Sequence, residues 1–392
     1  METNEATQQF IRSHRTDDVR RLALQGAKDP TVDFAFALQQ IAGWQKARQK
    51  IPSWAETEGI LYPPHLSMEQ CSSEQTARYK ASMAGEGTLM VDLTAGFGVD
   101  MAFICPRFQR AVHVEQQPSL CEISRANYRL LGLDHVEVVC GDAAEYLHQM
   151  PPADLLFIDP ARRDEHGGRT YGIADCTPNV LALRNEMLAK ARRVMVKLSP
   201  MLDWRKAVED LGRVNEVHIV SVNNECKELL LVLSQASSPL KLVCVNDGSV
   251  LEITAPQPTD FPNEPTAFLP EPATFLFEPN ASVMKAGCFR ELEHRFGVSQ
   301  LDPNSHLFLS DRDVRDFPGR RFVIDAVTTM NKRDLKAALQ GVERANITVR
   351  NFPLSVAELR KRLRLKDGGD CYILATSMAG RGHVLLLCHK AT

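Results

Sequence analysis

The chain has 392 residues, more than one typical domain, so we expect two or three hydrophobic cores. Hydrophobic residues make up 44% and charged residues 24% of the sequence, and no apolar run approaches the roughly 18 residues of a membrane helix. The first residues lack the basic and apolar regions of a signal peptide, so we expect a cytoplasmic protein that is not membrane-bound. The ten cysteines include no Cys-x-x-Cys pair, which argues against a zinc site or a disulfide framework, and we expect no bound metal.

The charge is unevenly distributed along the chain. The net charge is −3, but residues 320–392 contain 14 lysines and arginines against 6 acidic residues, which gives this segment +8 and the rest −11. Such asymmetry is typical of an attached polyanion-binding module, although solvated basic helix faces give the same count.

Residues 1–85 show apolar side chains at three- and four-residue intervals, which predicts helices interrupted at Pro52, Pro63 and Pro64. A capping sequence at residues 72–75 predicts a last helix before the first strand. Gln75, Arg78 and Lys80 are polar residues of that helix, and we expect them to be solvated, with lining of the ligand site as the alternative. We therefore expect a helical amino-terminal domain over residues 1–85.

Residues 89–100 read Leu-Met-Val-Asp-Leu-Thr-Ala-Gly-Phe-Gly-Val-Asp, an apolar run with an acid and then a Gly-x-Gly turn. This pattern predicts a buried strand that leads through a tight turn into a helix. Gly96 and Gly98 lack a Cβ, so the backbone can turn sharply and a ligand can approach it. Because a dinucleotide fingerprint has a third glycine where this chain has Met101, the turn predicts a nucleotide-like ligand and disfavours NAD.

From residue 89 onward, apolar strands alternate with helices, which predicts a parallel sheet. The second expected strand ends in Glu115, the third is followed by Asp142, and the fourth is followed by Asp159. Ligands of such sheets bind beyond the carboxyl ends of the strands, so we expect these acids to face the ligand. Acids at strand ends also cap helices, which is the alternative explanation for each of them taken alone.

The sequence Asp92-Leu-Thr-Ala-Gly-Phe-Gly, with Glu115 at 23 positions further and Asp142 after the third strand, resembles the class I S-adenosylmethionine (SAM) dependent methyltransferases. The resemblance implies an α/β fold with a Rossmann-like seven-stranded sheet and SAM as the cofactor. It also implies that Glu115 binds the ribose hydroxyls and that Asp142 binds the adenine amino group. The cofactor-binding residues implied by the resemblance are Asp92, Thr94, Ala95, Gly96, Gly98, Asp100, Glu115, Gln116, Asp142 and Ala143.

The sequence Asp159-Pro160-Ala161-Arg162 occupies the catalytic-loop position of that family. Members that methylate amines carry an Asp or Asn, two prolines and an aromatic residue here, which accept from and stack on the substrate base. The resemblance therefore implies Asp159 and Pro160 as catalytic residues, while Ala161 and Arg162 depart from the pattern and leave the acceptor atom open. Three arginines of this loop predict contacts to phosphate and base, with a solvated loop as the alternative: Arg162, Arg163 and Arg169.

The remaining pattern predicts strands at residues 194–198, 217–222 and 228–234, the last two joined by a turn so short that they must be antiparallel. We expect Lys197, Ser199 and the acid-rich residues 225–228 to serve the sheet edge rather than the chemistry. The catalytic domain is expected to span residues 86–236.

Residues 237–319 have a different composition, with seven prolines between positions 255 and 279. They predict a linker or extended loop, preceded by a hairpin around residues 246–248 and followed by one helix over residues 282–296. We expect a linker and a small α+β module here.

Residues 320–392 predict strands at 322–327, 347–350, 372–376 and 384–388, with helices at 332–339 and 356–363. This basic unit resembles the THUMP-like tail of some bacterial methyltransferases, and the whole chain resembles that helical-cap, methyltransferase and THUMP-like arrangement. THUMP domains bind structured RNA, so the resemblance implies RNA as a partner. The RNA-binding residues expected in this unit are Arg360, Lys361, Arg362 and Arg364.

These patterns together predict a cytoplasmic SAM-dependent methyltransferase that acts on a base of structured RNA, either rRNA or tRNA. One alternative is a small-molecule or protein methyltransferase, which would show no salt-dependent affinity for nucleic acid. The other is a non-catalytic RNA-binding scaffold with this fold, which need not bind SAM. The sequence names neither the modified base and atom nor the oligomeric state.

Overall fold

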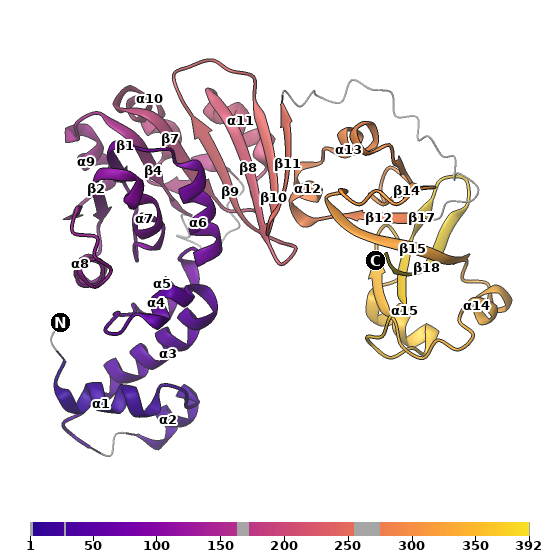
Figure 1. The fold of residues 1–392 in the computed structure, drawn as a ribbon, viewed down its shortest axis with the longest axis horizontal. Helices are drawn as coiled ribbons and strands as arrows, with labels where there is room; N and C mark the ends of the chain where they lie inside the picture. The colour runs from indigo at the N-terminus through magenta and orange to yellow at the C-terminus, as the bar shows by residue number, and fades with distance from the viewer. Residues whose placement is uncertain (1–2, 27–28, 163–171, 255–274, 392) are drawn as a thin grey trace. The chain divides into compact units, whose positions relative to one another are not determined.

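The computed structural model describes residues 3–26, 29–162, 172–254 and 275–391 (Figure 1). They form two compact units, of which the first comprises Met1–His218 and Lys227–Leu240. The second comprises Ile219–Cys226 and Lys241–Thr392.

The first unit begins with the helices predicted for residues 1–85. They are α1 (Glu5–His14), α2 (Val19–Gln25), α3 (Phe34–Lys50), α4 (Pro52–Glu56), α5 (His65–Gln70) and α6 (Glu74–Met83). Ser73 begins α6 as its N-cap, because its side chain accepts the backbone N–H of Thr76. Trp54 of α4 packs edge-on against Phe97 of the glycine turn, with 4.9 Å between ring centroids, so the helices share a core with the sheet.

The main sheet has nine strands within the described ranges, in the order β11-β10-β8-β9-β7-β4-β1-β2-β3. Their bounds are β1 (Gly87–Asp92), β2 (Phe108–Glu115), β3 (Val136–Cys140), β4 (Ala153–Ile158), β7 (Ala191–Leu198), β8 (Val214–Val222), β9 (Glu225–Leu233), β10 (Lys241–Asn246) and β11 (Ser249–Thr254). The pairs from β3 to β7 are parallel, and β9 runs antiparallel to β7. The predicted seven-stranded arrangement is confirmed, and the hairpin β10–β11 extends the sheet beyond β8.

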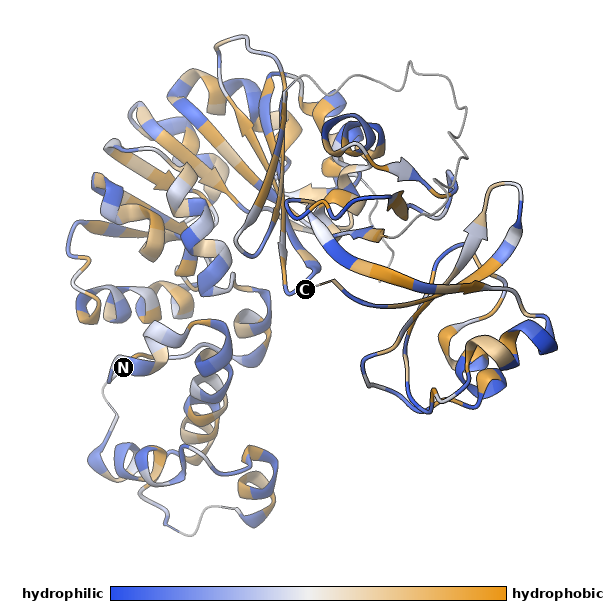
Figure 2. Cartoon of the chain, turned by 45° about the vertical axis from the view of Figure 1, so that its right-hand side comes forward, coloured by the Kyte–Doolittle hydropathy of each residue, from blue (hydrophilic) through white to orange (hydrophobic). Residues whose placement is uncertain are grey.

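Apolar runs explain why these strands are central. Met90, Val91, Leu155, Leu156 and Val194 are fully buried, as expected for parallel strands covered on both faces. Figure 2 shows this apolar colour along the strands, whereas apolar and polar colours alternate along the helices. A small separate sheet pairs β5 (Ala161–Arg162) with β6 (Cys176–Thr177). The connecting helices are α7 (Val99–Ile104), η1 (Cys105–Arg107), α8 (Pro118–Leu130), α9 (Ala143–Gln149), η2 (Ile173–Asp175), α10 (Val180–Lys190) and α11 (Trp204–Leu211).

The second unit contains another sheet, in the order β13-β14-β12-β15-β18-β17-β16. Its elements are β12 (Phe275–Pro279), α12 (Ala281–Ala286), α13 (Phe289–Phe296), β13 (Ser299–Gln300), β14 (Phe308–Ser310), β15 (Gly319–Thr328), α14 (Lys332–Ala338), β16 (Asn346–Val349), α15 (Val356–Leu363), β17 (Tyr372–Met378) and β18 (Gly382–Lys390). The strands and helices predicted after residue 320 are all present.

The single helix predicted over residues 282–296 is wrong. It is divided into α12 and α13 because Gly287 adopts a left-handed conformation, with φ of 67°, and its N–H closes the last turn on Val283. The predicted proline-rich linker lies largely outside the described residues, since only 275–279 are described and they form β12. No helix in the described segments is long and apolar enough to cross a membrane.

Candidate functional site

The turn after β1 is ordered by its own acid. Asp92 is buried at the end of β1, and its carboxylate accepts the backbone N–H of Thr94 at 3.0 Å. The N–H of Ala95 then donates to the Val114 carbonyl of β2 at 3.0 Å. The turn is therefore fastened to two neighbouring strands before the chain enters α7.

The two glycines of the turn differ in the space around them. Both have positive φ, 57° at Gly96 and 84° at Gly98. A Cβ at Gly98 would lie 2.2 Å from the Tyr128 hydroxyl, so packing requires a glycine there. A Cβ at Gly96 would meet no described atom within 4 Å, so this side of the turn is open to a ligand.

Glu115 and Asp142 both hold backbone amides. Glu115 is buried and accepts the N–H groups of Gly96 at 3.1 Å and Gln117 at 2.8 Å. Asp142 is exposed and caps α9 with one oxygen, which accepts two N–H groups at 2.8 and 3.0 Å. The capping explanation therefore applies to Asp142. A carboxylate has about four acceptor sites, so these bonds leave capacity for a ligand.

Of the other residues predicted to bind the cofactor, Thr94 and Ala95 are half-buried, Gln116 is exposed and Ala143 is buried. Asp100 lies in the first turn of α7, and its side chain is directed to a buried lysine described below. The turn thus brings most of the predicted residues to the carboxyl edge of β1, β2 and β3.

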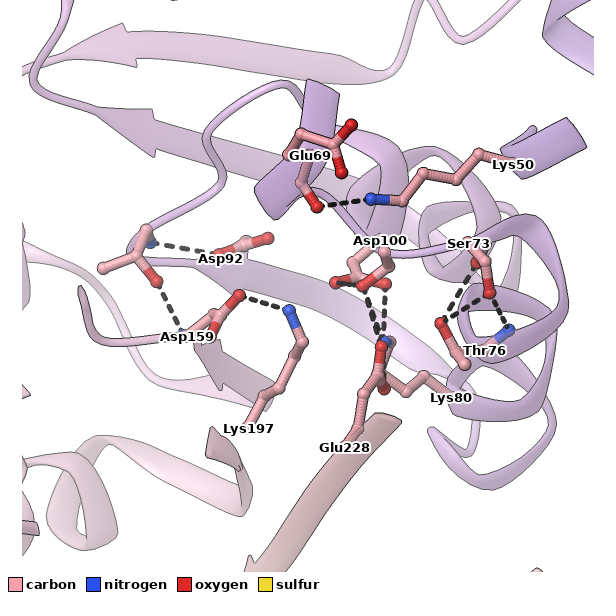
Figure 3. A network of polar contacts seen from close by, with 12 residues as sticks. Lys50, Glu69, Ser73, Thr76, Lys80, Asp92, Asp100, Asp159, Lys197 and Glu228 are labelled. Carbon is pink, nitrogen blue, oxygen red and sulfur yellow. Dashed lines mark hydrogen bonds and ion pairs between the residues drawn. The ribbon is translucent and has the colours of Figure 1, made fainter. Parts of the chain in front are cut away.

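Asp159 follows β4 and is tied to both neighbouring strands (Figure 3). Its backbone N–H donates to the Thr94 hydroxyl at 2.7 Å. Its carboxylate accepts a hydrogen bond from Lys197 Nζ at 2.5 Å. The Asp159 side chain is 35% exposed and the Lys197 side chain 10% exposed. Asp159 therefore presents a held, half-buried carboxylate beside the glycine turn.

The neighbouring residues of the predicted catalytic loop are only partly described. Pro160 is buried, and Arg162 belongs to the short strand β5. Arg163 and Arg169 lie outside the described residues.

A buried ion cluster adjoins Asp159, and we define the Lys80 cluster as Ser72, Lys80, Asp100 and Glu228. The fully buried Lys80 lies 2.5 Å from Glu228 Oε2, 3.0 Å from Asp100 Oδ1 and 2.9 Å from Ser72 Oγ (Figure 3). The Ser72 hydroxyl donates toward Asp100 at 2.7 Å, with Glu228 Oε1 at 3.1 Å. The cluster joins α6, α7 and β9.

The expectations for three of these charged residues are wrong. Lys80 is not solvated, because it lies on the same face of α6 as the buried Thr76 and Ala77. Lys197 and Glu228 are not at a sheet edge, since β7 and β9 are interior strands. The spacing of Lys80 with the buried residues of α6 is the sequence signal that could have revealed its burial.

The carboxyl groups of the site differ in their pKa values. Burial, with Asp100 and Asp159 nearby, raises the pKa of Asp92 well above its usual value. Burial also raises the pKa of Asp159, although Lys197 opposes the shift. Burial would raise the pKa of Glu228 as well, but Lys80 and Lys197 outweigh it and lower the pKa to about 2.

Lys197 is held in its charged form. Burial lowers its pKa, but Asp159, Glu228 and Asp100 together raise it above the usual lysine value. The Lys197 ammonium group therefore offsets part of the negative charge of these acids at neutral pH.

In the second unit, the basic residues predicted on α15 are not equivalent. Arg360 is half-buried and donates to the Ala345 carbonyl at 3.0 Å and to Asp367 at 2.6 Å. Lys361 and Arg362 are exposed, and the exposed Arg364 ends the helix with φ of 56°. Arg360 therefore has a structural task, whereas the other three present their charges to solvent.

The strand order, the glycine turn and the acids at the strand ends define a class I methyltransferase fold. Residues 275–318 match a ferredoxin-like domain family, and residues 319–390 match a THUMP domain-like family. The chain is 32% identical to a candidate methyltransferase from Porphyromonas gingivalis W83, whose crystal structure superposes with a TM-score of 0.89 over 100% of both chains. The chain therefore belongs to the family of that protein, and the predicted methyltransferase fold with a THUMP-like domain is confirmed.

More distant structures also match over less than half of this chain. An rRNA methylase from Streptococcus thermophilus is 15% identical, with a TM-score of 0.31 over 42% of this chain and 95% of that chain. A candidate methyltransferase from Streptococcus mutans, solved with SAH, is 12% identical, with a TM-score of 0.31 over 41% of this chain and 95% of that chain. No curated protein matches the chain.

Proposed function

We propose that the chain transfers the methyl group of SAM to a base of structured RNA, either rRNA or tRNA. The observation that carries this proposal is the bond from the Asp159 N–H to the Thr94 hydroxyl at 2.7 Å. This bond fixes the position of Asp159, the proposed catalytic residue, relative to the glycine turn, the proposed cofactor site. Methyl transfer needs such a fixed arrangement, because positioning of the two reactants supplies most of the rate.

The residues of the turn fit SAM. The open side of Gly96 leaves room for the ligand, and Glu115 and Asp142 retain acceptor sites for ribose hydroxyls and an adenine amino group. When bound, SAM supplies an electrophilic methyl group.

The protein side chains would then orient the acceptor. Thr94 fixes the Asp159 backbone and Lys197 fixes its carboxylate, so Asp159 is the group that aligns the nucleophile. A dedicated base is not required, because the nitrogen can lose its proton to water after transfer.

RNA is the proposed substrate because of the second unit. The THUMP-like match covers residues 319–390, and Lys361, Arg362 and Arg364 expose three cationic groups around the end of α15. Clustered cations of this kind bind phosphate backbones through counterion release.

Calorimetric titration with SAM, followed by transfer from labelled SAM to RNA from cells that lack the protein, tests the activity. In Asp159→Ala we expect unchanged SAM affinity and a loss of transfer of about 100-fold. Glu137→Ala is the control, because Glu137 is an exposed acid of β3 and should leave both measurements unchanged. Full transfer by Asp159→Ala would reject the assigned role. If the wild-type protein methylates small molecules or proteins but not RNA, the proposal of an RNA substrate is wrong. If it does not bind SAM, the chain is a non-catalytic scaffold.

The RNA contact is tested by the combined change Lys361→Ala, Arg362→Ala and Arg364→Asn, since Asn tolerates the left-handed conformation at position 364. We expect weaker RNA binding and a salt dependence whose log–log slope falls by about 1 for each lost phosphate contact. The matched control replaces Lys332, Arg333 and Lys336, three exposed cations of α14, with Ala. Equal losses in both triple variants would show that net charge, not α15, governs the affinity.

A further inference from the structure

Lys197 is the charged group that contacts Asp159 most directly. It lies on β7, whose Val196 pairs with Ile158 of β4, so Lys197 and Asp159 are neighbours across the two strands. The 2.5 Å bond from Lys197 Nζ occupies Asp159 Oδ2. With its side chain only 10% exposed, Lys197 has little freedom to turn away.

The surrounding charges leave Asp159 as the partner of Lys197. Acids face this region from β1, α7 and β9, and Lys50 of α3 and the Cys71 thiol also act on it electrostatically. Of these acids, Asp100 and Glu228 are already bound by Lys80 at 3.0 and 2.5 Å. Asp92 accepts the Thr94 N–H. Lys80 is therefore the direct ion-pair partner of Asp100 and Glu228, and Asp159 is the direct hydrogen-bond partner of Lys197.

This pairing determines what Asp159 can do to a substrate. A carboxylate held by an ammonium group accepts hydrogen bonds and takes up a proton less readily than the same buried carboxylate would without the ammonium group. The Asp159 side chain is 35% exposed, and a carboxylate with one oxygen bound still has further acceptor sites. It can thus orient a substrate group that donates an N–H.

We propose that Lys197 is a positioning residue that keeps Asp159 an oriented carboxylate, so that the site selects an acceptor nitrogen that carries hydrogen, such as an exocyclic base amine. The proposal rests on the proposed function. The nitrogen forms the N–CH₃ bond as the S–CH₃ bond breaks, with the electron pair of that bond left on sulfur, and the nitrogen then loses one proton to water. Asp159 accepts the hydrogen bond throughout and gains no proton.

The role of Lys197 can be tested on the ligand-free full chain by ¹³C NMR titration of aspartate carboxyl carbons, with the Asp159 signal assigned from Asp159→Asn. In Lys197→Met we expect the titration midpoint of Asp159 to move upward, and in Lys197→Arg to remain near the wild type. Arg193→Met is the matched control, because Arg193 is a cation of the same strand that pairs with Glu216 instead. An unchanged Asp159 midpoint in folded Lys197→Met overturns the proposal, and thermal unfolding verifies that the variant is folded.

The pH dependence of methyl transfer gives the second measurement. In Lys197→Met the rate should acquire an acid limb, with about tenfold loss for each pH unit below the Asp159 midpoint, and SAM affinity should stay unchanged. Lys197→Arg should keep the pH–rate profile of the wild type. Transfer by the wild type to an atom that carries no hydrogen, or an unchanged profile in Lys197→Met, overturns the proposal while the methyltransferase function stands. If the wild-type protein does not bind SAM, the proposed function is wrong. The NMR titration midpoint of Asp159 still shows whether Lys197 keeps Asp159 in its carboxylate form, because that measurement needs no cofactor.

Discussion

Replacing Lys80 with Met should destabilise the first unit more than any surface charge change. The side chain is fully buried, with Glu228 at 2.5 Å and Asp100 at 3.0 Å. Met keeps most of the volume but removes the charge, so two buried carboxylates lose their counterion. Removing one partner of a buried ion pair costs about 3–5 kcal/mol, and we expect a decrease of this size in the free energy of unfolding.

Urea denaturation at pH 7 measures this change. The control is Lys46→Met, because Lys46 contacts Glu69 at 2.7 Å on the surface, with both side chains more than a third exposed. That variant should remain within about 1 kcal/mol of the wild type. A loss of only about 1 kcal/mol in Lys80→Met would refute the reasoning, since it would place the buried cluster on a par with a surface pair.

The double variant Lys80→Met, Glu228→Gln separates lost charge balance from lost packing. Gln has nearly the shape of Glu without its charge, so the double variant should be more stable than Lys80→Met alone. The expected coupling between the two changes is about 1–3 kcal/mol. If the changes in the free energy of unfolding are strictly additive, the charges of Lys80 and Glu228 do not stabilise each other in the folded protein.

Two further predictions concern the glycine turn. Because burial raises the pKa of Asp92, its contribution to stability is present below the unfolded pKa of 3.8 and is lost as the pH rises through the folded pKa. Asp92→Asn should therefore be more stable than the wild type at pH 7 and lose this advantage near pH 3, and urea midpoints at the two pH values check it. Gly98→Ala should lower stability by about 2–5 kcal/mol, from left-handed strain and overlap with Tyr128. Gly96→Ala should lower the free energy of unfolding only by the left-handed strain, about 1–2 kcal/mol. Calorimetry should nevertheless show weaker SAM binding in this variant. Equal destabilisation by the two substitutions would contradict the different surroundings of the two glycines.

Local pattern was enough to predict most of the fold. Buried parallel strands are continuous apolar runs, so β1, β4 and β7 are visible in the sequence, and the short turn before β9 predicts its antiparallel direction. The break between α12 and α13 was missed because Gly287 lies inside an otherwise helical pattern. The hairpin β10–β11 was predicted, but the pattern of a hairpin does not show which sheet it will extend.

The candidate site was predictable where residues are close in sequence. Asp92, Thr94 and the glycines act within one turn, so their motif is compact. The buried charges were not predictable in this way, because Lys80 and Glu228 are 148 positions apart and each looks like a surface residue alone. Only the fold brings their opposite charges together, and only the pairing makes burial of either one tolerable.

The Lys80 cluster also determines where this protein can be divided. A fragment that begins at residue 86 would keep the whole parallel sheet and both acids, Asp100 and Glu228, while losing the ammonium group that α6 supplies to them. It would also expose the face of the sheet core covered by Trp54 and its neighbours. Helices α3 to α6 are therefore an integral part of the methyltransferase fold in this chain, and shortened versions for crystallisation or assay should keep these helices and not begin at the first strand.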